Sequence, residues 1–221
     1  MIIDLKKFVS KIRTFDSYYM KQFDGFWRWK LKTETEGKHI LDENHRRETC
    51  RRVWSILRGW QAYRPCDSTV CLKVLKDSLR NASEAYNQIR SYTLLEFDKV
   101  SNHSLELIWH ELGRIKEEGG NTSGSGHYYI VSLSKHLMFL WGQTLAFDSR
   151  VKAHIPRFNI YSYVINHTKW SFETWKTVMG NFQEGLKQMP QVVDLFKKES
   201  IRRYGTDSNV PYGRFLDIYY H

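Results

Sequence analysis

Asp148 occupies a position where an aspartate can begin a helix or take part in catalysis. It lies in the stretch GQTLAFDSRVKAHIP (142–156), between an apolar run and a basic segment that carries Arg150 and Lys152. An aspartate before a helix accepts hydrogen bonds from the first turn, and the free amides and helix dipole keep it ionised. The same carboxylate could stabilise positive charge on a substrate or orient an attacking water. The residue by itself is compatible with both roles.

A lysine and a glycine-rich loop precede this aspartate. Lys135 lies in the apolar segment 128–141, which we expect to be a helix that ends at Gly142. A lysine on such a helix either extends its amine to solvent or directs it into a cleft. The loop before the helix contains Gly124, Ser125 and Gly126. Backbone amides at a helix start form an anion site suited to a phosphate, although a Gly/Ser loop is also a common flexible connector.

The order of these features resembles the helix–hairpin–helix DNA glycosylase superfamily. The matching parts are the Gly-Ser-Gly hairpin at 124–126, the helix over 128–141 and the turn Phe-Asp-Ser-Arg-Val at 147–151. The segment SLSKHLMFLWGQTLAFDSRV is also similar to bacterial glycosylase-like proteins, some of which act in defence against phage. The resemblance implies two helical lobes with a cleft between them, a hairpin that binds a DNA phosphate, and Asp148 as the catalytic carboxylate. A modified pyrimidine of phage DNA is then one candidate substrate.

The chain departs from the family pattern at two places that bear on mechanism. The hairpin lacks the usual Leu-Pro-Gly opening, and Tyr128 stands near the position where bifunctional members carry their Schiff-base lysine. We therefore expect a monofunctional enzyme in which Asp148 directs a water and Lys135 is a structural or electrostatic helper. The alternative is a shortened hairpin with Lys135 as the attacking amine.

The resemblance also suggests which residues contact DNA. Aromatic side chains grip bases that have left the stack, but the same side chains are often simple core residues. Candidates for the base pocket are Trp141, Phe147, Tyr161 and Trp170. Candidates for phosphate contacts are Gly124, Ser125, Gly126, His127, Arg150, Lys152 and Arg157, together with His154 when it is protonated.

Composition indicates a globular protein with an anionic partner. The chain has 221 residues, a formal net charge of +10 and 15% aromatic residues. The positive charge favours a polyanionic partner, and the aromatic side chains can stack on its bases. The expected partner is double-stranded DNA with a flipped base, without an obligate protein partner. No apolar run is long enough to span a membrane, and residues 1–16 lack the apolar core of a signal peptide, so we expect a cytoplasmic protein. Two other hypotheses are a nucleic-acid-binding module without catalysis and a scaffold or membrane-surface protein.

No cofactor or metal is expected from the cysteines and histidines. Cys50, Cys66 and Cys71 form no Cys-x-x-Cys pair, and three thiolates are too few for a typical iron–sulfur cluster. His103 and His110 share a helical face, but no third ligand accompanies them. The missing cluster cysteines also place the chain outside the iron–sulfur branch of the superfamily.

The elements that must position these residues are helices. Apolar residues recur at helical spacing over 4–14, 43–64 and 102–118, with Asp42 as an N-cap, and further helices are expected over 69–97, over 169–189 and from Pro190. No strand alternation and no repeat is present. The sequence predicts an all-α fold in one glycosylase-like unit over 1–221. Two lobes, 1–40 plus 157–221 and 41–156, could form within that unit.

Overall fold

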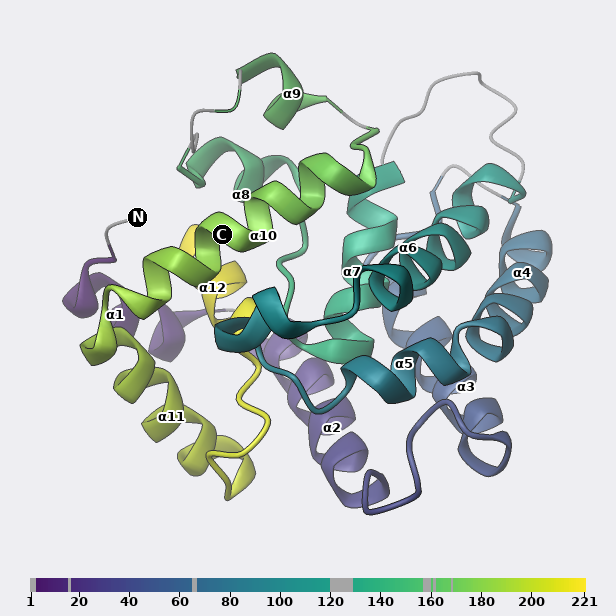
Figure 1. The fold of residues 1–221 in the computed structure, drawn as a ribbon, viewed down its shortest axis with the longest axis horizontal. Coiled ribbons are helices and arrows are strands. Elements are labelled where there is room, and N and C mark those ends of the chain that lie inside the picture. The colour runs from purple at the N-terminus through teal and green to yellow at the C-terminus, as the bar shows by residue number, and fades with distance from the viewer. Residues whose placement is uncertain are drawn as a thin grey trace.

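The computed structural model describes residues 3–15, 17–64, 67–119, 129–156, 160, 162–167 and 169–221. These residues fold into helices joined by turns, and a single isolated β-bridge joins Thr35 to Lys38. The all-α expectation is therefore confirmed for the described part of the chain (Figure 1). In chain order the elements are α1 (Leu5–Thr14), α2 (Ser17–Thr33), α3 (Glu43–Gly59), α4 (Ser68–Asn81), α5 (Ser83–Ile89), the 3-10 helix η1 (Leu94–Lys99), α6 (Asn102–Glu117), α7 (Tyr129–Trp141), α8 (Ser149–His154), α9 (Ser162–Asn166), α10 (Phe172–Lys187), α11 (Pro190–Tyr204) and α12 (Tyr212–Tyr220).

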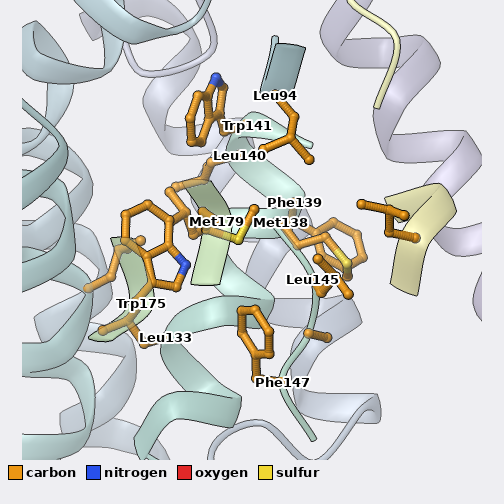
Figure 2. Close-up of a cluster of buried hydrophobic side chains, with 14 of the residues drawn as sticks. Leu94, Leu133, Met138, Phe139, Leu140, Trp141, Leu145, Phe147, Trp175 and Met179 are labelled. Atoms are coloured by element: carbon orange, nitrogen blue, oxygen red, sulfur yellow. The ribbon is translucent and has the colours of Figure 1, made fainter. Parts of the chain in front are cut away.

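Helix α7 forms the centre of the fold and packs against α2, α3 and α6 (Figure 1). Only two of its 13 residues, Val131 and Lys135, are not buried. A helix that is apolar on all sides has to lie inside the protein, because no face of it is suited to water. Figure 2 shows Phe139 and Trp141 of this helix in one apolar cluster with Trp175 and Met179 of α10. The half-buried Lys135 is thus a cation held within a largely apolar helix.

The first and last helices of the chain pack against each other. Helix α1 lies on α12, and the ring of Phe8 contacts the rings of Phe196 in α11 and Tyr219 in α12, with centroid distances of 4.6 and 6.4 Å. Helix α11 also packs against α2. Other contacts cross the lobe boundaries expected from the sequence, because α8 packs on α12 and η1 packs on α10. The helix–hairpin–helix arrangement and the two lobes remain predictions.

Several helices begin at an aspartate, and the sequence predicts this for Asp42 and Asp148. The side chain of Asp42 accepts a hydrogen bond from the amide of His45 at the start of α3, and Asp67 caps α4 through Thr69 and Val70. Each cap satisfies amides that have no partner inside the helix, which typically contributes about 1 kcal/mol. None of the described helices has both the length and the apolar character needed to cross a membrane.

Candidate functional site

Asp148 caps helix α8 through only one of its two carboxylate oxygens. Oδ1 accepts from the amides of Arg150 and Val151, at 3.0 Å in each case, which confirms the expected N-cap. No group in the described part of the chain donates to Oδ2. The side chain is half-buried and lines two adjoining hollows of about 260 and 320 Å³. The carboxylate therefore holds the helix start and also faces a space that a ligand can enter.

The segment that presents Asp148 is a buried connection over residues 142–147. It begins at Gly142, whose φ of +78° is left-handed, and a Cβ there would lie 2.3 Å from the ring of Trp27. Only glycine fits this conformation and this space without strain. The next residue, Gln143, accepts from the amide of Leu94 and donates to the carbonyl of Val210, at 2.9 and 3.0 Å. These contacts fix the path of the connection where it leaves α7.

Two side chains hold the end of this connection next to the aspartate. The amide of Phe147 donates to Oγ of Ser134 in α7, at 3.0 Å. The amide of Ala146 donates to Oδ1 of Asp217 in α12, at 2.9 Å. Because a buried amide without a partner is costly, both acceptors restrain the backbone immediately before Asp148. The carboxylate is thus positioned from both α7 and α12.

Helix α12 reaches this connection through a glycine. A Cβ on Gly213 would lie 2.3 Å from backbone atoms of Gln143 and Thr144, so the helix and the connection touch backbone to backbone. One residue later, the guanidinium of Arg214 donates to the carboxylate of Asp217, and both side chains are only 2% exposed. This buried ion pair lies at the inner end of the first hollow.

The first hollow combines charged groups with aromatic walls. Its lining residues are Phe15, Tyr19, Trp60, Lys135, Ala146, Asp148, Ser149, Arg150, Arg214, Asp217 and His221. Arg214 and Asp217 form its deep end, whereas Ser149 and Arg150 are exposed at its rim. The rings of Tyr19 and Trp60 meet edge to face at a centroid distance of 5.1 Å. Such a site can enclose a flat apolar ring and place polar groups around its edge.

The second hollow lies between Asp148 and the end of helix α3. It is lined by Trp60, Gln61, Arg64, Val131, Lys135, Asp148 and Ser149. The amide of Gln61 donates to the carbonyl of Arg58 and that of Ala62 to the carbonyl of Leu57, at 3.1 and 3.0 Å, which is the Schellman arrangement that ends many helices. Glycine usually occupies the left-handed position of this motif, but here Gln61 has a φ of +58°. A residue with a strained backbone thus borders the hollow beside Asp148.

Lys135 places its amine between the two hollows. Nζ donates to the carbonyl of Trp60 at 3.1 Å and lies over the ring of that residue. Burial lowers the pKa of Lys135, and the negative charges of Asp148 and Asp217 oppose that effect. In its protonated form the amine places a positive charge next to the Asp148 carboxylate.

The other titratable groups of the first hollow are also perturbed. Burial and the nearby charge of Asp148 raise the pKa of Asp217 to about 6, against the opposing effect of Arg214. Burial lowers the pKa of His221, whose ring meets Phe15 edge to face at 5.1 Å. Perturbed groups gathered in one hollow are typical of functional sites, although structural ion pairs produce them as well.

Only some of the residues expected to bind phosphate lie at this site. Arg150 is at the rim of the first hollow. Lys152 is half-buried, and its amine donates to the carbonyls of Asn166 and His167, at 3.3 and 3.4 Å. His154 is exposed, and its Nδ1 lies 2.8 Å from the carbonyl oxygen of Arg150. Gly124, Ser125, Gly126, His127, Arg157 and Tyr161 lie outside the described residues.

Three of the four aromatic residues expected to form a base pocket are buried in the core. Trp141 and Phe147 are 1% and 0% exposed and belong to the apolar cluster of Figure 2. Trp170 is also buried, and its ring packs on Phe147 at a centroid distance of 4.7 Å. None of the three lines either hollow. The aromatic walls come instead from Phe15, Tyr19 and Trp60.

Sequence reasoning missed the contribution of helix α12. The segment GRFLDIYY (213–220) places Arg214 and Asp217 three positions apart in an otherwise apolar helix. Two opposite charges at this spacing lie on one helical face, and a charged pair on a buried face is a signal for a site. Tyr19 lies on α2 and carries no comparable signal.

Comparisons with protein-family models, with curated proteins and with solved structures yielded no match to the chain. In the part of the chain that the structure describes, no three histidine, cysteine, aspartate or glutamate side chains are grouped so that they could hold a metal ion. Cys50 and Cys71 are buried, and burial raises the pKa of the Cys50 thiol to about 11.

Proposed function

We propose that the protein is a monofunctional DNA glycosylase that hydrolyses the N-glycosidic bond of a modified or damaged base. The observation that supports it best is the arrangement around Asp148. One oxygen of this carboxylate holds the start of α8, and the side chain faces hollows with aromatic walls, the amine of the half-buried Lys135 and an arginine at the rim. A carboxylate held in this way can act on a sugar whose base has entered the hollow.

The chemistry needs one carboxylate and one water. As the bond between the sugar carbon and the base nitrogen breaks, positive charge develops on the sugar, and the Asp148 carboxylate stabilises it. A water held by Asp148 forms the new carbon–oxygen bond and gives up a proton, and the base leaves with the bonding electrons and is protonated. The products are a free base and an abasic site. The Lys135 amine, bound to the carbonyl of Trp60, acts here through its charge.

The net charge of +10 supports a DNA partner, since cations at the surface attract phosphates over a distance. Arg150 at the rim of the first hollow and Arg64 beside the second flank Asp148 on two sides. Double-stranded DNA with one flipped nucleotide could therefore place phosphates near these arginines and the sugar near the carboxylate. The role in the cell would be repair or defence against phage.

Replacing Asp148 with asparagine tests this proposal. Asparagine is as good an N-cap as aspartate, so Asp148→Asn should fold with nearly unchanged stability. The rate of base release should fall by about 100-fold or more, while DNA binding is retained or becomes tighter. The matched control is Asp67→Asn, which changes another N-cap aspartate with the same two-amide geometry at the start of α4. Base release that persists in Asp148→Asn would refute the proposal.

The substrate panel for this assay consists of duplexes with damaged bases and duplexes with phage-type modified pyrimidines. Strand breaks that need alkali indicate an abasic product and a monofunctional enzyme. Covalent adducts trapped by borohydride would instead assign Lys135 as an attacking amine, and Lys135→Gln should then abolish trapping.

A second candidate function is a nucleic-acid-binding module without catalysis. The cap geometry favours it in one respect, because two amide bonds to Oδ1 already account for an aspartate at position 148. In that case Asp148→Asn leaves every function intact, and wild-type protein binds the panel without releasing any base.

A further inference from the structure

The buried pair Arg214–Asp217 has hydrogen-bonding capacity beyond its own ion pair. Nη1 of Arg214 donates to Asp217, and Nη2 lies 3.4 Å from the sulfur of Met20, a weak acceptor. Nε is buried without a partner in the described structure. An arginine with five donors and one strong acceptor is unusual at 2% exposure, because buried donors are normally satisfied. This guanidinium, at the deep end of the first hollow, is therefore suited to a ligand that supplies acceptors.

The walls around the pair restrict the shape of that ligand. The guanidinium carbon of Arg214 lies 5.4 Å from the ring centroids of Phe15 and Trp60, which both line the hollow. The hollow measures about 260 Å³, which is below the range of about 300–1,000 Å³ typical of sites for drug-sized ligands. Aromatic walls and a small volume favour a single flat ring system. A pyrimidine base is a single flat ring of this kind, whereas a purine is a larger fused pair of rings, and the pyrimidine edge carries donors and acceptors.

We infer that Arg214 and Asp217 read the edge of the extruded base, and that this base is cytosine or a cytosine substituted at C5. The inference rests on the proposed function. An arginine only donates hydrogen bonds and an ionised carboxylate only accepts them. Cytosine presents an amino donor beside two acceptors, which complements this pair. Uracil and thymine present a carbonyl where cytosine has the amino group. Their carbonyl oxygen would then face the Asp217 carboxylate, and both groups are acceptors. A substituent at C5 lies off this edge and leaves the pattern unchanged.

Binding to duplexes with an unpaired test base measures this preference. The Asp148→Asn protein, which is expected to leave the base attached, is titrated with two duplexes that differ only in carrying deoxycytidine or deoxyuridine opposite an abasic site. The measurement is made at about pH 7.5, where Asp217 with its pKa of about 6 is ionised. We expect the deoxycytidine duplex to bind about tenfold more tightly, since a good polar pair discriminates bases by about that factor.

Further variants assign the preference to the pair. Adding Asp217→Asn should abolish the tenfold difference, because the amide both donates and accepts. That change leaves Arg214 without its counter-charge, so the double replacement Arg214→Gln with Asp217→Asn, which removes both buried charges, is measured in parallel after circular dichroism confirms its fold. Asp77→Asn is the matched control and should keep the preference, because it breaks an exposed aspartate–arginine pair with Arg80 on α4.

Two results would overturn the inference. One is that the Asp148→Asn protein binds the two duplexes equally, binds the deoxyuridine duplex more tightly, or binds neither of them. The other is a preference that survives in the doubly replaced, folded protein. Neither result bears on whether Asp148 is needed for base release, so failure here is distinct from failure of the proposed function.

Discussion

The carboxylate of Asp217 accepts a hydrogen bond from the amide of Ala146 at 2.9 Å, although the two residues are 71 positions apart in the chain. Ala146 lies two residues before Asp148, and Asp217 is also the ion-pair partner of Arg214. One side chain therefore links the floor of the first hollow to the backbone that presents the candidate catalytic carboxylate. A substitution that alters Asp217 should therefore also shift the backbone at Ala146, and a shift at Ala146 should affect Asp217.

Replacing Ser134 with alanine should weaken the other support of the same backbone. The variant leaves the buried amide of Phe147 without an acceptor, and we expect the free energy of unfolding to fall by about 1–3 kcal/mol. Urea denaturation measures the change. The matched control is Ser132→Ala, two residues earlier on α7, because the Ser132 hydroxyl is equally buried and has no partner among the described residues. Ser132→Ala should be nearly neutral, and an equal loss in both variants would contradict the prediction.

His136 should make stability depend on pH. Its ring is buried between the hydroxyl of Tyr63 and the carbonyl of Ser132, and burial lowers its pKa from 6.5 to about 4. Below about pH 6.5 the His136 ring is therefore protonated in the unfolded chain, whereas in the folded chain it stays neutral down to about pH 4. Stability is lost as the pH falls from about 6.5 to about 4, by about 3 kcal/mol in total.

The variant His136→Gln isolates this contribution, because glutamine can still donate and accept. We expect it to be less stable than wild type at pH 7, with the difference shrinking or reversing by about pH 4. Comparing the two proteins at each pH cancels the other titrating groups, among them Asp217. A difference that stays constant from pH 7 to pH 4 would show that His136 is not the group responsible.

Gly213→Ala should disrupt the approach of α12 to the segment that carries Asp148. The new Cβ would lie 2.3 Å from the backbone of residues 143 and 144, so one element has to move. We expect a loss of about 3 kcal/mol or more in the free energy of unfolding and a lower rate of base release. Gly180→Ala is the control, because this glycine lies inside α10 with open space around its Cβ position. That variant should gain about 0.5–1 kcal/mol, as alanine favours a helix over glycine.

Gln61→Gly should make the protein more stable and at the same time weaken its binding to DNA. Glycine relieves the left-handed conformation at this position, so the free energy of unfolding should rise by about 1 kcal/mol. The side-chain amide that borders the second hollow is lost, and binding of DNA with an extruded nucleotide should weaken. Asn209→Gly is the control, since Asn209 also has a positive φ but lies in the turn between α11 and α12. If DNA binding changes equally in both variants, Gln61 has no specific role.

Local patterns in the sequence determined the helices and the position of Asp148. Asp148 had to cap α8, because the first amides of a helix need an acceptor and aspartate supplies one within two or three residues. The apolar residues of α7 had to lie inside the protein, and Gly142 had to end that helix. These conclusions depend on neighbours in the chain, so composition and spacing are sufficient to reach them.

The tertiary structure alone decided what surrounds Asp148. Trp141 and Phe147 lie in the core, because an aromatic residue on a buried helix or connection looks the same in sequence whether it packs or lines a pocket. Arg214 and Asp217 reach the site because α12 touches residues 143 and 144 at Gly213. That contact joins segments far apart in the chain, and its partners are selected by packing across the whole fold, which no local spacing records.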